Sequence, residues 1–246
     1  GGYYSAPLPV SSYYDYVKDK ITQGNEKVEF PFSGNLTSAD GKHTGHIIGR
    51  NIQFSQGISS KWGALLFPGG GFRENVVELP APILSESSYT ICMWLKPLKQ
   101  TSWTSSIYVR YRGGFCTFSP FVTGGYCIFR ISEDTDISGF HDALARQIPQ
   151  DIWTFVCVTY DHFTEIGITY INGRKAGFRT DAPSLPACRQ ILLGGDPFQP
   201  SYEGYLSGVT FYEDVKSEDE VWEIYQHFCQ EPGFCGNMED FWMDNV

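Results

Sequence analysis

Apolar and polar positions alternate in short runs along most of the chain, and the run that starts at Trp153 is the most informative. Trp153, Phe155 and Cys157 fall on one face of an extended segment, while Val156 and Val158 fall on the other. Because both faces are apolar, this segment is predicted to be a strand that is covered on both sides, as in the interior of a β-sandwich.

A tight hairpin is predicted directly after this strand. The run 167–171 meets Asn172-Gly173, the dipeptide that most readily supplies two residues with positive φ, and the run 174–178 returns.

Further short runs are separated by turn-forming residues, at intervals typical of an all-β sandwich. The segment 89–95 is apolar on both faces and is predicted to be the second central strand. By contrast, residues 132–150 are interpreted as a long polar insertion. The other predicted strands are 28–32, 47–54, 64–67, 75–79, 107–111, 115–118, 126–131, 190–194 and 208–212.

One short helix is predicted near the carboxyl end of the chain. Ser217 and Glu220 have the spacing of a capping box. An apolar stripe at helical spacing follows them, formed by Val221, Ile224, Tyr225 and Phe228. The predicted domain spans 27–229. Residues 1–26 are predicted to be an N-terminal extension or linker with a marginal helical turn, and residues 230–246 a C-terminal tail with little fixed structure.

Composition supports a single, well-packed domain. The chain has 246 residues, of which 41% are hydrophobic and 16% aromatic, enough for one large β domain. Its formal charge of −10, without a cluster of Lys and Arg, argues against nucleic acid or an anionic membrane as the partner. No apolar run approaches the roughly 20 residues of a membrane helix. We therefore expect a soluble ectodomain or a fragment of one, without a transmembrane segment.

The seven cysteines indicate an oxidising compartment. The sequence has no CxxC motif and no His/Cys pair at zinc-finger spacing, so disulfides are favoured over a zinc site. Cys157, in the middle of a predicted buried strand, is either a small hydrophobic residue or half of a bridge. Asn35-Leu36-Thr37 is a sequon, so we expect N-glycosylation at Asn35 in a secreted protein.

Four segments together resemble the laminin-G-like and pentraxin-like domains of the concanavalin A-like lectin and glucanase superfamily. Each motif is weak alone, but their order and spacing are specific. The resemblance implies an all-β, two-sheet antiparallel jelly-roll sandwich with one short C-terminal helix. The four segments are WGALLFPG at 62–69, SYTICMW at 88–94, WTFVCVTYD with YING at 153–173, and EGYLSGVTFY at 203–212.

The resemblance also implies a disulfide. In pentraxins the cysteines of the two core strands are bridged, and Cys92 and Cys157 fall on those positions. Cys116 and Cys127 flank a hairpin-like segment and are predicted to form a second, local bridge. Of the three cysteines that remain, two are predicted to pair and one to be left over: Cys188, Cys229 and Cys235.

The segment after residue 193 departs from the pentraxin pattern. Pentraxins bind two calcium ions with an acid- and amide-rich loop at this position, whereas here Asp196 is kept and the neighbouring glutamate and glutamine are missing. A pentraxin-type calcium site is therefore not expected. Asp196, Phe198, Tyr202 and Glu203 are instead predicted to form a ligand rim, with a solvated turn as the alternative.

A separate calcium site is predicted in the polar insertion. Asp134, Asp136 and Ser138 alternate and precede a glycine, with Asp142 beyond, so that several oxygens could bind one calcium ion. Ala145 stands where an EF-hand has its distal glutamate. The alternative is an acidic, solvated surface loop.

No catalytic pattern is present in the sequence. Glycosidases of this superfamily place paired carboxylates on one face of a strand, and no Glu-x-Asp-x-x-Glu run lies in a predicted strand. There is no Gly-x-Ser-x-Gly elbow and no phosphate loop. His43 and His46 share a loop but lack a third ligand. We therefore predict that the chain is not an enzyme.

The leading hypothesis is an extracellular recognition or adhesion module, part of a larger receptor or matrix protein, that binds a protein or a glycan, with calcium as a possible cofactor. The alternative is a carbohydrate-binding module or a domain of a carbohydrate-active enzyme. In that case Trp103, Tyr108 and Tyr111 would stack on sugar rings, although packing explains these aromatics equally well. A third hypothesis is an oligomerisation unit.

Overall fold

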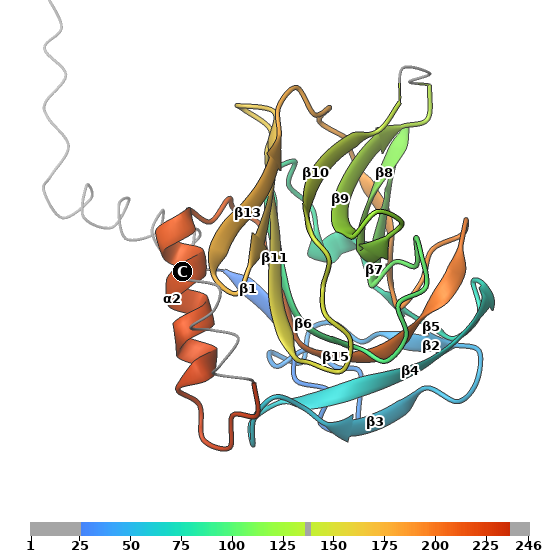
Figure 1. The fold of residues 1–246 in the computed structure, drawn as a ribbon, viewed down its shortest axis with the longest axis vertical. Coiled ribbons are helices and arrows are strands. Elements are labelled where there is room, and N and C mark those ends of the chain that lie inside the picture. Colours follow the sequence, from blue (N-terminus) through green and yellow to red (C-terminus); the bar gives the residue numbers. More distant parts are fainter. Residues whose placement is uncertain (1–25, 136–138, 237–246) are drawn as a thin grey trace, which may run out of the picture.

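Two antiparallel sheets packed face to face make up the body of the molecule (Figure 1). The computed structural model describes residues 26–135 and 139–236. The helical turn predicted within residues 1–26, and residues 237–246 of the tail predicted at 230–246, therefore lie outside the described residues. Within the described ranges, no helix has the length and apolar character needed to cross a membrane.

The first sheet has eight strands, seven of them in one continuous path and β1 (Lys27–Phe30) paired with β15. In spatial order the seven are β13 (Arg174–Arg179), β12 (Ile166–Ile171), β11 (Thr154–Asp161), β6 (Tyr89–Pro97), β15 (Pro200–Tyr212), β4 (Gly63–Phe72) and β3 (Gln53–Gln56).

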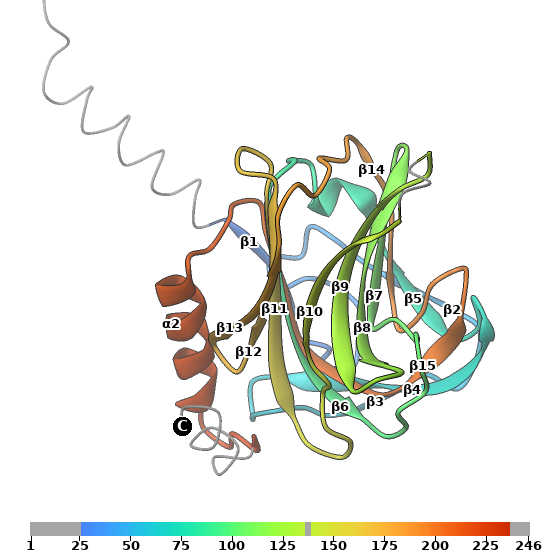
Figure 2. The same ribbon diagram turned by 45° about the horizontal axis from the view of Figure 1, so that its top comes forward.

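The second sheet has seven strands, and Figure 2 shows it facing the first across the core. Its strands in spatial order are β10 (His141–Arg146), β9 (Tyr126–Glu133), β8 (Gly114–Val122), β7 (Ile107–Tyr111), β14 (Cys188–Leu193), β5 (Val76–Leu79) and β2 (His46–Ile48). A short 3-10 helix (Ala81–Ile83) follows β5. This architecture is the predicted jelly-roll sandwich with one C-terminal helix, α2 (Glu218–Cys229).

Strand β11 is buried on both faces, as the alternation of its sequence predicted. Val156 and Val158 belong to the core between the sheets. Phe155 and Cys157 belong to a second core on the outer face of the same sheet, where Tyr225 of α2 packs on Phe155 with ring centroids 5.7 Å apart. The eight-stranded sheet is therefore covered by the other sheet on one side and partly by α2 on the other.

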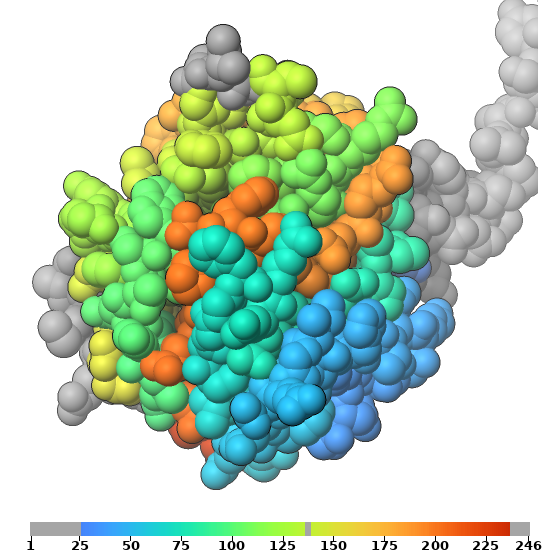
Figure 3. Space-filling model, turned by 90° about the vertical axis from the view of Figure 1, so that its right-hand side faces the viewer, coloured from blue at the N-terminus to red at the C-terminus, as the bar shows by residue number. Residues whose placement is uncertain are grey.

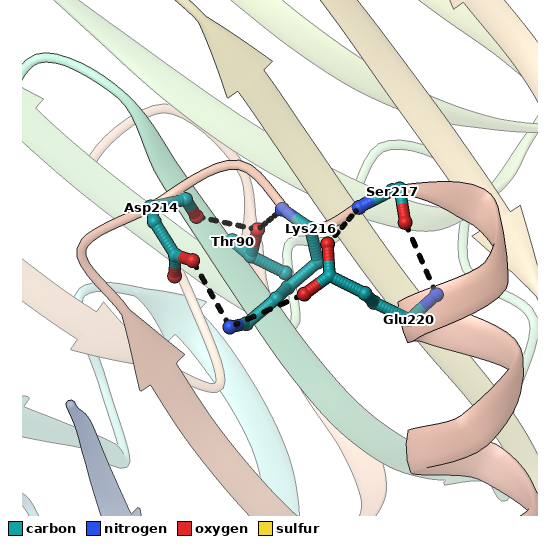
Figure 4. Close-up of polar contacts among 5 residues, drawn as sticks. All are labelled: Thr90, Asp214, Lys216, Ser217 and Glu220. Carbon is teal, nitrogen blue, oxygen red and sulfur yellow. Dashed lines mark hydrogen bonds and ion pairs between the residues drawn. The ribbon is translucent and has the colours of Figure 1, made fainter. Parts of the chain in front are cut away.

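The start of α2 is tied to the sheet by the contacts drawn in Figure 4. The Ser217 hydroxyl accepts from the Glu220 N–H at 3.2 Å, and the Glu220 carboxylate accepts from the Ser217 N–H at 3.0 Å, which confirms the capping box. The buried Lys216 ammonium lies 3.0 Å from Asp214 and 3.8 Å from Glu220. Thr90 of β6 donates to the Asp214 carbonyl and accepts from the Lys216 N–H.

The hairpin after β11 forms as predicted. Asn172 and Gly173 both have positive φ, at 49° and 79°, and join β12 to β13. A Cβ at Gly173 would lie 2.6 Å from the ring of Trp222, so the residue must be glycine for α2 to pack there.

Two sequence-based predictions of strands were wrong. The single predicted strand 47–54 is two strands in different sheets, β2 and β3, separated by Gly49 and Asn51 with positive φ. The polar insertion 132–150 contains β10, an edge strand paired with β9. Its inward residues are the small Ala143 and Ala145, which give little hydrophobic alternation.

The structure confirms the disulfide between Cys92 and Cys157. The two residues are direct partners across the antiparallel pair β6 and β11, with their Cα atoms 4.2 Å apart. The bridge thus staples the two central strands at the face that α2 covers.

The predicted Cys116–Cys127 bridge was wrong, because both thiols are free. Strand register explains this: Cys116 of β8 lies opposite Ile131 of β9, several residues from Cys127. The pairing expected among the last three cysteines is also absent, since Cys188, Cys229 and Cys235 are free.

The packed body continues past the end of α2. Phe234 lies against Trp94 with ring centroids 5.4 Å apart, and the Cys235 N–H donates to the Ile58 carbonyl at 2.6 Å. The described part of the predicted tail is therefore attached to the outer face of the eight-stranded sheet.

We expect reduction of the Cys92–Cys157 bridge to lower the free energy of unfolding by about 4 kcal/mol, because the bridge closes a loop with a sequence separation of 65. Urea unfolding with and without reductant measures the difference. A variant with both cysteines replaced by alanine is the control, and reductant should leave its midpoint unchanged. Equal midpoints for oxidised and reduced wild-type protein would contradict the prediction.

Burial raises the pKa of the Cys116 and Cys127 thiols to about 12, so at pH 8 both remain protonated. We expect iodoacetamide to label the exposed Cys235 first in the folded protein and to spare these two. In denaturant without reductant, mass spectrometry should find every cysteine labelled except Cys92 and Cys157. Protection of Cys116 and Cys127 in denaturant would mean that they are bridged after all.

Candidate ligand-binding site

The outer face of the seven-stranded sheet carries the candidate site. Strand alternation points Val109, Phe118 and Phe129 into the sandwich core, so their neighbours along β7, β8 and β9 point outward. Figure 3 views the molecule from this side, where the orange segment that leads into β15 lies beside the teal end of β4. The register agrees, since Pro200 of β15 pairs with Phe72 of β4.

A hollow of about 390 Å³ lies on this outer face, and we call it the aromatic hollow. Strands β8 and β9 form its floor, and three loops supply its walls: the β6–β7 loop, the segment before β10 and the β14–β15 loop. It is lined by Trp103, Ser105, Phe115, Thr117, Ser119, Ile128, Arg130, Phe140, Asp196, Phe198 and Gln199.

Exposed aromatic rings form the walls of the aromatic hollow. Phe198 is 47% exposed and Phe140 49% exposed. The Phe198 ring contacts Phe115 of β8 at a centroid distance of 5.0 Å, and Tyr108 of β7 packs beneath at 5.8 Å from Phe115. Burial raises the pKa of the Tyr108 phenol, so this residue supports the wall as a neutral group.

Arg130 of β9 is held between rings and a carboxylate. Its guanidinium carbon lies 4.5 Å from the centroid of the Trp103 ring and 3.6 Å from that of Phe140, distances at which cation–π attraction operates. The Arg130 Nε and Nη2 groups donate to the two oxygens of Asp142 at 2.8 and 2.9 Å. Asp142 is the cross-strand partner of Arg130 on β10, so the sheet register itself brings the two together.

Asp196 builds the β14–β15 loop. Its buried carboxylate accepts from the Ser105 hydroxyl at 2.5 Å and from the N–H groups of Phe198 and Gln199 at 2.7 and 2.9 Å. These three bonds fix the turn that presents the Phe198 ring and join it to the β6–β7 loop. Asp196 therefore positions the wall of the aromatic hollow.

Two hydroxyl groups on the floor remain available. Thr117 and Ser119 of β8 are only 6% and 4% exposed, and both line the aromatic hollow. Within the described part of the chain, no side-chain hydrogen bond is made by either hydroxyl. Neither oxygen is among the described side-chain atoms that are buried without a partner, so both hydroxyls reach the aromatic hollow and can bond to a polar ligand there.

The structure separates the four residues of the predicted ligand rim. Asp196 and Phe198 line the aromatic hollow. Tyr202 does not, because it is buried in the core against Phe67, with its hydroxyl donating to the Tyr205 carbonyl at 3.1 Å. Glu203 lies on β15 opposite Pro68 and does not line the hollow either.

The three aromatics of the alternative hypothesis also separate. Trp103 lines the aromatic hollow, in a backbone conformation with φ of 71°. Tyr108 supports the wall from below, and Tyr111 faces the core. Sequence reasoning missed Phe115 and Arg130, although alternation on the predicted strands 115–118 and 126–131 places both on the outward face.

The predicted calcium ligands are only partly described. Asp136 and Ser138 lie outside the described residues. Asp134 accepts two hydrogen bonds from Arg110, at 3.0 and 2.6 Å, and Asp142 is bound by Arg130. Among the described residues no group of three or more His, Cys, Asp or Glu could hold a metal ion. The calcium site stays a prediction.

Asn35 of the sequon is exposed, and its side chain accepts from the Thr37 N–H at 3.0 Å. Glycosylation there also stays a prediction.

A larger hollow, of about 780 Å³, lies near the β11–β12 turn. Its lining includes Glu86, Asp161 and Glu213, together with Phe163, which is 85% exposed. We favour the smaller aromatic hollow because ligand sites combine apolar walls with a few convergent polar groups.

The chain belongs to the concanavalin A-like lectin/glucanase superfamily, whose Laminin_G_3 family model matches residues 69–222. This confirms the resemblance seen in the sequence. No curated protein matches the chain in sequence.

Several solved structures share the fold. One is domain 4 of AbnA, a GH43 extracellular arabinanase from Geobacillus stearothermophilus, in complex with arabinotriose; it is 20% identical, with a TM-score of 0.69, over 82% of this chain and 100% of that domain. The botulinum neurotoxin type G receptor-binding domain is 12% identical, with a TM-score of 0.60, over 83% of this chain and 51% of that one.

A structure of botulinum neurotoxin type C, whose cell entry depends on interaction with two ganglioside molecules, is 11% identical, with a TM-score of 0.62. It aligns over 85% of this chain and 52% of that one. The present chain thus spans about half the length of the two toxin chains. At these identities the likeness establishes the fold.

We expect replacement of Asp196 by alanine to lower the free energy of unfolding by about 1–3 kcal/mol, because buried donors lose their acceptor. Asp196→Asn should lose less, since its amide oxygen can still accept from the two N–H groups of the turn. Urea unfolding of both variants measures the effect. Unchanged stability of Asp196→Ala would show that the turn does not depend on this carboxylate.

Proposed function

We propose that this chain is an extracellular, non-catalytic recognition module that binds a glycan in the aromatic hollow. The observation that carries the proposal is the convergence of exposed rings, Arg130 and two unpartnered hydroxyls in one preformed hollow.

The chemistry of sugars fits this combination. A pyranose or furanose ring has C–H faces that pack on aromatic rings, and Trp103, Phe140 and Phe198 provide such surfaces. Its hydroxyl groups need donors and acceptors, which the hydroxyls of Thr117 and Ser119 supply. A protein ligand with a flat surface would contact the rings, but it would not reach the recessed hydroxyls of Thr117 and Ser119.

Related folds support the choice of a glycan. The arabinanase domain was solved in complex with arabinotriose, and cell entry of the type C neurotoxin depends on interaction with two ganglioside molecules. Of the hypotheses drawn from the sequence, the alternative of a carbohydrate-binding module agrees best with this proposal. Such a module can equally belong to a receptor, a matrix protein or an enzyme of several domains.

The state of the nearby carboxylates supports binding without catalysis. Glycoside hydrolysis uses one carboxyl as acid and a second as base or nucleophile. Asp196 is occupied by three hydrogen bonds and Asp142 by Arg130, so neither is free to act on a bound sugar. The extracellular location is supported by the Cys92–Cys157 disulfide.

Calcium assistance belongs to the same proposal. Of the predicted calcium ligands, the described Asp134 and Asp142 pair with Arg110 and Arg130, and Arg130 lines the aromatic hollow. Glycan titrations in calcium and in EDTA test this part separately, and equal affinity in both would remove calcium from the proposal.

We expect the wild-type protein to bind glycans on an array, and Phe198→Ala and Trp103→Ala to weaken the best binder by about tenfold each, a loss of about 1.4 kcal/mol that is typical of one aromatic contact. Titration calorimetry measures the affinities. Phe163→Ala is the matched control, because it removes an exposed ring at the distant β11–β12 turn. A blank array, or an equal loss in Phe163→Ala, would refute the proposal.

A further inference from the structure

We infer that the aromatic hollow selects neutral glycans, and that Arg130 reads adjacent sugar hydroxyls through the N–H groups that Asp142 leaves unused. This inference rests on the proposed function and specifies its ligand class. Its basis is the pairing of Arg130 and Asp142 inside an aromatic frame.

The guanidinium of Arg130 is held in one orientation. Trp103 and Phe140 contact it, and Asp142 binds the edge formed by Nε and Nη2. The bidentate geometry is rigid, because five N–H groups of a guanidinium lie in one plane. The Arg130 side chain is therefore already oriented when a ligand binds and does not need to change its rotamer.

Some N–H groups of the Arg130 guanidinium are not used by Asp142. Among the described residues, no acceptor is bound to Nη1 of Arg130, whose side chain is 16% exposed and lines the aromatic hollow. The edge formed by Nη1 and Nη2 points away from the Nε side that Asp142 occupies. Two oxygens on neighbouring carbons of a sugar can accept from this edge.

The charge balance decides between hydroxyl and carboxylate ligands. Arg130 is the sole cationic side chain among the lining residues that the structure describes. Two carboxylates, Asp142 and Asp196, lie with it, and the whole chain carries a formal charge of −10. A uronic acid or a sulfated sugar would bring a further negative charge into this setting, whereas a neutral hydroxyl gains the hydrogen bonds without that repulsion.

The inference makes Asp142 the residue that sets the charge selectivity. Asp142→Asn keeps the size of the side chain and removes the charge that compensates Arg130. A second arginine–carboxylate pair on the same sheet, Arg110 with Asp134, lies outside the lining of the hollow. Asp134→Asn is therefore a matched control for the general loss of one negative charge, and all titrations are run in EDTA so that its predicted role as a calcium ligand does not enter.

The test compares arabinotriose and cellotriose, as neutral trisaccharides, with trigalacturonic acid on the same array and by titration calorimetry. We expect the wild-type protein to bind a neutral trisaccharide at least tenfold more tightly than the acidic one. Asp142→Asn should lower the ratio of the neutral to the acidic affinity by about tenfold. Asp134→Asn should leave this ratio unchanged. Thermal unfolding of each variant confirms that it is folded.

Arg130→Lys provides a second measurement that does not depend on Asp142. Lysine keeps the charge but cannot present two donors in a plane, so neutral trisaccharides should bind about tenfold more weakly. Tighter binding of trigalacturonic acid by the wild type, or an unchanged ratio in folded Asp142→Asn, would overturn the inference and leave the proposed function intact. Absence of binding by any glycan on the array would overturn the proposed function itself.

Discussion

The pairing of β6 with β11 is the constraint on which the rest of the structure depends. Both strands are apolar on both faces, and the Cys92–Cys157 bridge joins them at their centre. A sheet with two apolar faces needs two covers, because leaving either face in water would forfeit the free energy of hydrophobic burial. The seven-stranded sheet covers one face and α2 covers part of the other. Within the described residues, no α-helix covers the outer face of the seven-stranded sheet, and this face holds the aromatic hollow.

The sequence predicted those parts of the fold whose signals are local and strong. The two central strands, the Asn172-Gly173 turn and the capping box of α2 each follow from neighbouring residues. Strand β10 was missed because alanines at its inward positions give weak alternation, and because it is held mainly by pairing with β9. The wrong Cys116–Cys127 pairing has the same origin, since strand register depends on contacts that cysteine spacing does not encode.

The candidate site was predictable only in part. Alternation alone places Phe115 and Arg130 on one outward face, and Phe198 was among the predicted rim residues. Phe140 could not be assigned, because its place on the wall depends on the loop geometry before the unpredicted strand β10. Tyr202 was placed wrongly because the strand β15 begins earlier than its apolar pattern indicates, which turns this side chain into the core.

Charged residues on this face act in pairs that the register of the sheet determines. Sequence alone suggested that Asp134 and Asp142 were free to bind calcium, yet each accepts two hydrogen bonds from an arginine on a neighbouring strand. A bidentate pair fixes an arginine side chain that would otherwise lose rotamer entropy when a ligand binds. Asp196 does the same for the Phe198 wall through three hydrogen bonds. The hydrogen bonds that hold Arg130 and the Phe198 wall do not need a ligand, so the binding proposed for the aromatic hollow would carry a smaller entropy cost.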